Sequence, residues 1–180
     1  MGKRALQKPL AEARCLAIGG GAIGLGAALA LAAAGAKDIW LAEPHAERRA
    51  IAAKSGDFRT YDPTSAAGPN APDLIIDGVG IEPTRAAASA NVRPGGVIVH
   101  ISLGSATGGL DIRRMTLQEI TLIGTYTYTM QDFRDTAAAI YDGRLGALNW
   151  HEIRPLSDGA RAFEDLNAGR AAAPKIILVP

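Results

Sequence analysis

Short apolar runs alternate along the first two thirds of the chain with helix-favouring segments and with turns rich in Gly and Pro. Residues 15–18 form one such run, which ends in three glycines and is followed by an alanine- and leucine-rich stretch up to Gly35. This order predicts a strand, a tight turn and a helix. Residues 39–42 and 47–54 repeat the arrangement and predict a second strand and a second helix.

The pattern continues with further strands at residues 58–61, 74–76, 97–101 and 120–124, and with a helix at residues 84–92. The stronger runs are apolar at every position, as expected when helices cover both faces of a parallel sheet. The sequence therefore predicts an α/β fold, specifically a Rossmann-type doubly wound parallel sheet.

The last third of the chain has a different pattern. Thr129 and Asp132 have capping-box spacing ahead of a helix, and Ser157 is expected to cap a second helix. Residues 176–179 are expected to form a strand. We therefore predict a dinucleotide-binding domain over residues 12–128 and a C-terminal helix–strand appendage over residues 129–180.

Composition narrows the classes of function. The formal net charge is +1, and the basic residues are scattered, so the sequence shows no footprint for nucleic acid or an anionic membrane. Cys15 is the single cysteine, which leaves no disulfide framework or zinc-thiolate cluster. Residues 27–36, the longest stretch of small apolar residues, are too few to span a bilayer. We expect a cytoplasmic protein with small-molecule or protein partners.

Gly19, Gly21 and Gly24 have G-x-G-x-x-G spacing between the first predicted strand and helix. In this motif the first glycine permits the tight turn, the second lets the backbone approach a pyrophosphate, and the third lets the helix lie close to the strand. Such spacing also arises from packing alone in glycine-rich chains. Its position between a strand and a helix favours a dinucleotide, with the phosphates at the helix N-terminus.

Glu43 follows the second predicted strand, about 20 residues after the glycines, where a carboxylate accepts hydrogen bonds from the adenine ribose. Its charge would repel a 2′-phosphate, so NAD is favoured over NADP. Arg48 and Arg49 leave the alternative open, because a guanidinium nearby can serve a 2′-phosphate as well as a ribose hydroxyl.

Several stretches together resemble the zinc-binding alcohol dehydrogenases of the medium-chain dehydrogenase/reductase superfamily. They are GGGAIGLGAALALAAAGA, AEPHAERR, LIIDGVG, RPGGVIVHISL, LIGTYTYT and AFEDLNAGRAAAPKIILVP. The resemblance covers the cofactor-binding half and the tail that completes the catalytic module in the family. The N-terminal module that carries the catalytic zinc ligands has no counterpart here. The start of the chain resembles the segment that precedes the first strand of the cofactor domain in the full-length family. The resemblance thus implies a truncated chain that is catalytically incompetent alone.

The resemblance implies roles for particular residues. It places the glycine motif around the pyrophosphate and nicotinamide, Glu43 and Arg48 at the adenine ribose, and Lys175 within reach of the pyrophosphate. Ser102 departs from the family pattern, which usually has a glycine there that lets the backbone approach the ligand closely. The cofactor-binding residues implied are Gly19, Gly21, Ala22, Ile23, Gly24, Glu43, Arg48, Val79, Gly80, Thr84, Ile101, Ser102, Leu103 and Lys175.

Zinc is expected only in the missing module. The three histidines, His45, His100 and His151, lie far apart in the sequence and have no ligand spacing, so we expect structural roles for them. His100, inside an apolar strand, is expected to be a hydrogen-bonded core residue.

The function predicted is the NAD(H)-binding portion of an alcohol dehydrogenase-like oxidoreductase, with hydride transfer between an alcohol and nicotinamide in the full-length enzyme. Three alternatives stay open. They are a zinc-free, NADPH-dependent quinone or enoyl reductase, a non-catalytic dinucleotide-binding module, and, more remotely, a methyltransferase.

The tail raises the question of partners. We expect Trp150, Ile153, Phe163 and Leu166 to lack the cover that the family's catalytic module supplies. An apolar patch of that size predicts a partner, which would be a second copy joined at the sheet edge near residues 120–124, a separate catalytic-module chain, or the domain itself if the tail collapses onto it.

Overall fold

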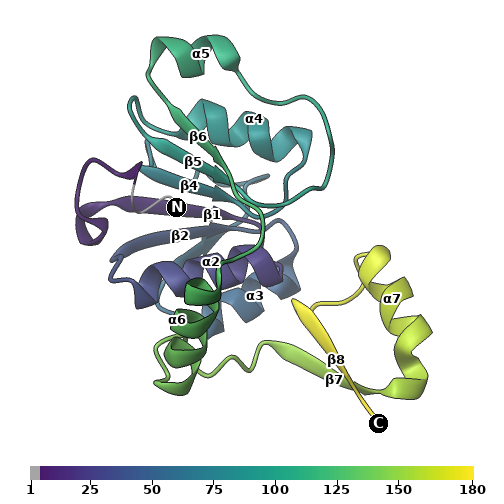
Figure 1. Cartoon of the computed structure of the whole chain (residues 1–180). Coiled ribbons are helices and arrows are strands. Elements are labelled where there is room, and N and C mark those ends of the chain that lie inside the picture. Colours follow the sequence, from purple (N-terminus) through teal and green to yellow (C-terminus); the bar gives the residue numbers. More distant parts are fainter. Residues whose placement is uncertain (1–4) are drawn as a thin grey trace.

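The computed structural model describes residues 5–180, and its main feature is a six-stranded parallel sheet (Figure 1). The strand order is β3-β2-β1-β4-β5-β6, the doubly wound order in which the chain reverses direction beside β1. The predicted fold class is confirmed. The strands are β1 (Arg14–Ile18), β2 (Asp38–Ala42), β3 (Arg59–Tyr61), β4 (Leu74–Asp77), β5 (Val97–His100) and β6 (Thr121–Gly124).

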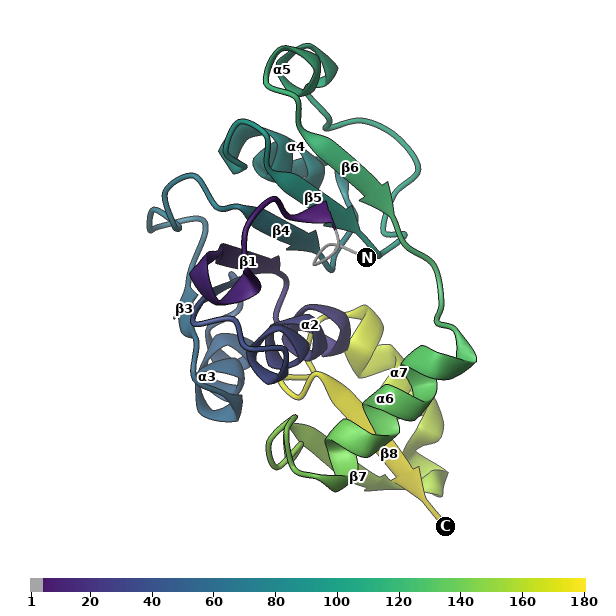
Figure 2. The same ribbon diagram turned by 60° about the vertical axis from the view of Figure 1, so that its left-hand side comes forward.

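Helices cover both faces of this sheet, which explains why its central strands are apolar throughout (Figure 2). Leu25 and Leu29 of α2 belong to the core cluster on one face, and Ala88 of α4 belongs to the cluster on the other. The helices of this part are the short 3₁₀ turn η1 (Leu10–Glu12), α2 (Ala22–Ala33), α3 (Ala46–Ser55), α4 (Glu82–Asn91) and α5 (Ile112–Leu117).

The C-terminal third forms a separate two-stranded parallel sheet with flanking helices, drawn in colours from green to yellow in Figure 1. Its elements are α6 (Met130–Tyr141), β7 (His151–Pro155), the 3₁₀ turn η2 (Leu156–Asp158), α7 (Gly159–Asn167) and β8 (Lys175–Val179). The capping box of Thr129 and Asp132 at the start of α6 is confirmed.

Two expectations for the tail are corrected. Ser157 does not cap α7, because it lies inside η2 and the helix begins after Asp158 without a side-chain cap. Trp150 does not lack cover, since its ring packs against the main core together with Leu145 and Leu148. Ile153, Phe163 and Leu166 are exposed, at 61%, 69% and 40% of their surface, so most of the predicted patch is uncovered in this chain.

Within residues 5–180, no helix has the length and apolar character needed to cross a bilayer.

Candidate functional site

The three motif glycines occupy three different environments at the carboxyl end of β1. Gly19 has a φ of +99°, a conformation that favours glycine, and its amide donates to the Ala42 carbonyl at 2.8 Å. A Cβ on Gly24 would overlap the Gly19 carbonyl oxygen, so this glycine lets α2 lie against the turn. A Cβ on Gly21 would meet no atom within 4 Å, so the space above it is open.

The first turn of α2 faces this open space with its backbone amides. The first amides of any helix have no intrahelical acceptor, which here applies to Ala22 and Ile23. Gly21 is the N-cap, and no side chain caps the helix in their place. Such amides, with the positive end of the helix dipole, form an anion-binding site. The turn therefore fits a pyrophosphate without any basic side chain.

Glu43 lies directly after β2 and is turned toward the glycine motif. Its Oε2 accepts a hydrogen bond from the Gly20 amide at 2.7 Å, and its Oε1 accepts one from the His45 amide at 2.8 Å. The side chain is buried, with the residue only 6% exposed. The carboxylate predicted to bind the adenine ribose is thus held beside the glycine turn.

The basic residues near Glu43 are engaged with the protein backbone. Arg49 donates to the carbonyls of Glu43 and Pro44, at 2.7 and 3.0 Å, and forms an ion pair with Asp62. Arg48 donates through Nε to the Ala171 carbonyl at 3.0 Å, which ties α3 to the tail. Lys175 is an exposed residue that starts β8 in the second sheet, so the structure does not group it with the glycine turn.

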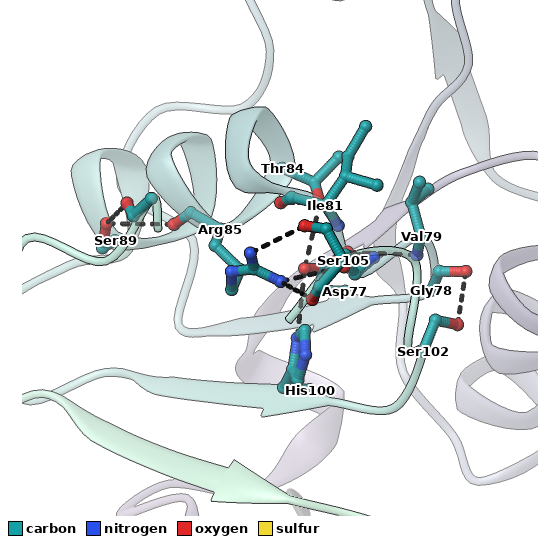
Figure 3. Close-up of polar contacts among 12 residues, drawn as sticks. Asp77, Gly78, Val79, Ile81, Thr84, Arg85, Ser89, His100, Ser102 and Ser105 are labelled. Atoms are coloured by element: carbon teal, nitrogen blue, oxygen red, sulfur yellow. Dashed lines mark hydrogen bonds and ion pairs between the residues drawn. The ribbon is translucent and has the colours of Figure 1, made fainter. Parts of the chain in front are cut away.

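The loop after β4, which carries Gly78 and Val79 (Figure 3), packs against the glycine turn. A Cβ on Gly19 would lie 2.6 Å from the Val79 side chain. Gly80 has a φ of +71°, and a Cβ there would overlap the Ser102 carbonyl, so only a bare backbone lets the two loops meet. Thr84 caps α4 by accepting from the Ile81 amide at 3.1 Å.

The segment after β5 adjoins this loop. Ile101 donates to the Asp77 carbonyl and packs against the core, whereas Leu103 is 80% exposed. The Ser102 hydroxyl donates to the Gly78 carbonyl at 2.7 Å. The side chain that replaces the family's glycine is therefore turned toward the neighbouring loop.

Sequence reasoning missed two polar residues of this region. Asp77 is fully buried, accepts hydrogen bonds from two loop amides and the Thr84 hydroxyl, and lies 3.2 Å from the His100 Nδ1. Arg85 is 7% exposed and donates to the Gly80 carbonyl at 2.9 Å and to carbonyls of Ser105, Thr107 and Gly108. A charged residue ending an apolar strand was the available signal for Asp77. Arg85 had no comparable signal, because a single basic residue on a predicted helix usually faces solvent.

The histidines make hydrogen bonds within the protein. His45 caps α3 by accepting from the Arg48 amide, and His151 lies 3.1 Å from the Leu148 carbonyl. His100 lies 3.2 Å from Asp77, which confirms the expected hydrogen bond, but it is only partly buried at the end of β5 and does not belong to the core. Over residues 5–180, no three His, Cys, Asp or Glu side chains are grouped so that they could hold a metal ion.

The strand order and the glycine turn at its switch point define a nucleotide-binding α/β domain. Residues 22–142 match the family described as zinc-binding dehydrogenase, and the chain belongs to this family.

Comparisons with individual proteins agree. The chain is 36% identical over 149 residues to a probable diacetyl reductase, (R)-acetoin forming, of Saccharomyces cerevisiae; the match covers 75% of this chain and 36% of the relative. Acetophenone reductase of Geotrichum candidum in complex with NAD superposes with a TM-score of 0.85, at 22% identity over 99% of this chain and 51% of that one. A zinc-binding dehydrogenase of Sinorhizobium meliloti bound to NADP gives a TM-score of 0.78, at 22% identity, over 93% and 52%. The chain thus spans between a third and about half of the length of these relatives.

Proposed function

We propose that this chain is the NAD(H)-binding portion of an alcohol dehydrogenase-like oxidoreductase. In the complete enzyme, hydride passes between an alcohol and the nicotinamide. One observation carries the proposal. An open turn with free helix amides at Gly21 lies beside a fixed carboxylate at Glu43. Family membership supports the class of reaction.

Each part of the site has a task in this proposal. The amides at the start of α2 bind the pyrophosphate, and Glu43 binds the adenine ribose through oxygen lone pairs that its two backbone donors leave free. The Val79–Gly80 loop and the segment from Ile101 to Leu103 line the remainder. The bound nicotinamide supplies or accepts the hydride.

We propose NAD over NADP as the cofactor, although relatives carry either one. A buried carboxylate at the ribose would repel a 2′-phosphate. The two arginines that could attract this phosphate, Arg48 and Arg49, are bonded to backbone carbonyls. This arrangement favours NAD over the NADPH-dependent reductase alternative.

The described residues do not fit a zinc ion, because they include no cluster of ligands. We propose that residues 12–128 are the cofactor domain and residues 129–180 a tail that completes a catalytic module. That module or a second copy of the chain would cover the exposed Ile153 and Phe163.

A cytoplasmic location is proposed because the single thiol, Cys15, is buried and unpaired.

Isothermal titration of the chain with NADH tests the proposal. Binding in the micromolar range is expected, with weaker binding of NADPH. Absence of NADH binding at millimolar concentrations would refute the proposed function, and equal affinities for NADH and NADPH would remove Glu43 from its role. S-adenosylmethionine is the control ligand, and its binding without NADH binding would indicate a methyltransferase instead.

A further inference from the structure

Asp77 ends β4 with a carboxylate that is withdrawn from solvent and bonded on both oxygens (Figure 3). Oδ1 accepts hydrogen bonds from the amides of Val79 and Gly80 at 3.1 and 2.9 Å. Oδ2 lies 3.1 Å from the Thr84 hydroxyl and 3.2 Å from the His100 Nδ1. An ionised carboxylate can only accept, so a hydrogen bond between these two groups uses the histidine tautomer with a proton on Nδ1.

These contacts fix one side chain between two elements and one loop. Thr84 comes from α4 and His100 from β5, so Oδ2 is held from two directions, while Oδ1 holds consecutive amides of the loop. Hydrogen bonds to a charged group are stronger than those between neutral groups, and a buried carboxylate that lost its donors would be costly. The loop conformation therefore depends on Asp77.

The same loop forms one side of the glycine turn. The Gly78 amide donates to the Ile18 carbonyl at 3.0 Å, and a Cβ on Gly78 would lie 2.9 Å from the backbone of Gly24. Val79 packs over Gly19. A shift of this loop by a fraction of an ångström would therefore reach the backbone that faces the proposed pyrophosphate.

The opposite side of the loop is bonded as well. The Ser102 hydroxyl donates to the Gly78 carbonyl, and the Arg85 guanidinium donates to the Gly80 carbonyl. Side chains therefore bind two carbonyls of this loop, while Asp77 binds two of its amides. A backbone restrained on both its amides and its carbonyls loses little further entropy when a ligand binds.

We propose that Asp77 is a positioning residue for the dinucleotide. Oriented by His100 and Thr84, it fixes the Val79 and Gly80 amides, and through them the wall of the glycine turn, without touching the ligand. This inference rests on the proposed function. It adds a residue that controls the affinity for the dinucleotide without contacting it.

Three variants test it by NADH titration. Asp77→Ala removes the acceptor and is expected to raise the Kd for NADH at least about tenfold. Asp77→Asn keeps an oxygen for the amides and an amide group for Thr84 or His100, so it is expected to stay within about threefold of the parent. Asp73→Ala is the matched control, because Asp73 is also buried but precedes β4, at the end of the strand away from the turn, where Arg14, Lys8 and Arg93 bind it. It is expected to lower stability and leave the Kd within about twofold.

Amide hydrogen exchange of the unliganded chain gives a second measurement. Asp77→Ala is expected to speed exchange at Val79 and Gly80, and Asp73→Ala is not. If Asp77→Ala does not fold, His100→Leu takes its place, since it removes one donor to Oδ2 and leaves both amide contacts; faster exchange at both amides and a Kd about threefold higher are expected.

The outcomes separate the two proposals. If the parent chain fails to bind NADH, the proposed function is wrong and the inference falls with it. If the parent binds and the folded Asp77→Ala chain, or His100→Leu in its place, binds equally well, the inference alone is overturned. An equal loss in Asp73→Ala would also overturn it, because affinity would then follow overall stability.

Discussion

At the scale of single residues, Gly21 and Gly24 separate binding from folding within one motif. Space is open above Gly21, whereas α2 packs at Gly24 against the turn itself. Substitution at the two positions should therefore fail in different ways.

Gly21→Val is expected to abolish NADH binding and to change the melting temperature little, because its side chain enters the space proposed for the phosphates. Gly24→Val is expected to destabilise the fold by about 3 kcal/mol or more through its clash with the Gly19 carbonyl. Titration with NADH and thermal unfolding of both variants check this. A Gly21→Val chain that still binds NADH would contradict the pyrophosphate assignment.

The negative charge of Glu43 leads to a prediction about the choice between NADH and NADPH. Glu43→Gln is expected to shift the ratio of NADPH to NADH affinity at least about tenfold toward NADPH, because it removes a buried negative charge where the 2′-phosphate would lie. Competition titrations of both ligands measure the ratio. Glu47→Gln, on the outer side of α3, is the control and should leave the ratio unchanged.

Cys15 is expected to be chemically inert in the folded chain. Burial, with added repulsion from the charges of Asp73 and Asp38, raises the pKa of its thiol to about 12. The thiolate is the reactive form, so a disulfide reagent at pH 8 should modify Cys15 only at the rate of unfolding. Fast modification under native conditions would show that β1 opens.

At the scale of elements, Asp73 joins the amino ends of β1 and β4 to the segment before them. Burial alone would raise the pKa of Asp73, but hydrogen bonds from Lys8, the Arg14 amide and Arg93 outweigh it, and the pKa is lowered. A carboxyl with a lowered folded pKa contributes stability above its unfolded pKa, and this contribution disappears as pH falls through the folded value.

Asp73→Asn is therefore expected to lose about 1.5–3 kcal/mol at pH 7 and to show a smaller stability loss than the parent chain between about pH 5 and pH 2. Urea unfolding over this range measures both effects. Parallel pH profiles for the two chains would show that another carboxyl governs acid unfolding.

Local signals predicted most of the elements, and their failures have physical causes. The runs that become β1, β4 and β5 are buried on both faces, so their composition identifies them. β7 lacks a strand signal because HEIRP has one apolar residue among charged ones and ends in proline, and its partner β8 lies 24 residues further along. α5 is not among the predicted helices, because six residues carry too little periodicity to indicate one.

The same distinction applies to the site. Gly19, Gly21, Gly24 and Glu43 could be predicted because their roles depend on spacing within one βαβ unit. Asp77 and Arg85 act through the tertiary contacts of a loop, and Arg85 reaches backbone some 20 residues away. No local pattern encodes that distance.

At the scale of the whole molecule, exposed apolar side chains continue from the free edge of the sheet into the tail. β6 lies at the end of the strand order, and Leu122 on it is 40% exposed. Tyr126, Tyr128 and Phe133 follow, and Tyr128 stacks on Phe133 with ring centroids 6.1 Å apart. An unpaired edge beside such a surface favours association.

The direction of the amides on β6 allows this to be tested without disturbing the sheet. The Thr121 amide donates to the carbonyl of Gly96, just before β5, and the Thr125 amide donates to the carbonyl of His100, the last residue of β5. Because amide direction alternates along a strand, the Leu122 amide points to the free edge, where proline is tolerated. Leu122→Pro is expected to remove self-association through this edge while the chain stays folded.

Ile123→Pro is the contrasting variant, since its amide faces β5 and its loss should unfold the sheet edge. Light scattering after size exclusion should show a dimer for the parent chain and a monomer for Leu122→Pro. A parent chain that is monomeric at high concentration would rule out association through β6, and the exposed tail would then need a separate catalytic-module chain as its partner. A dimer that survives in Leu122→Pro would place the contact on the tail, because the edge of β6 could no longer supply its hydrogen bond.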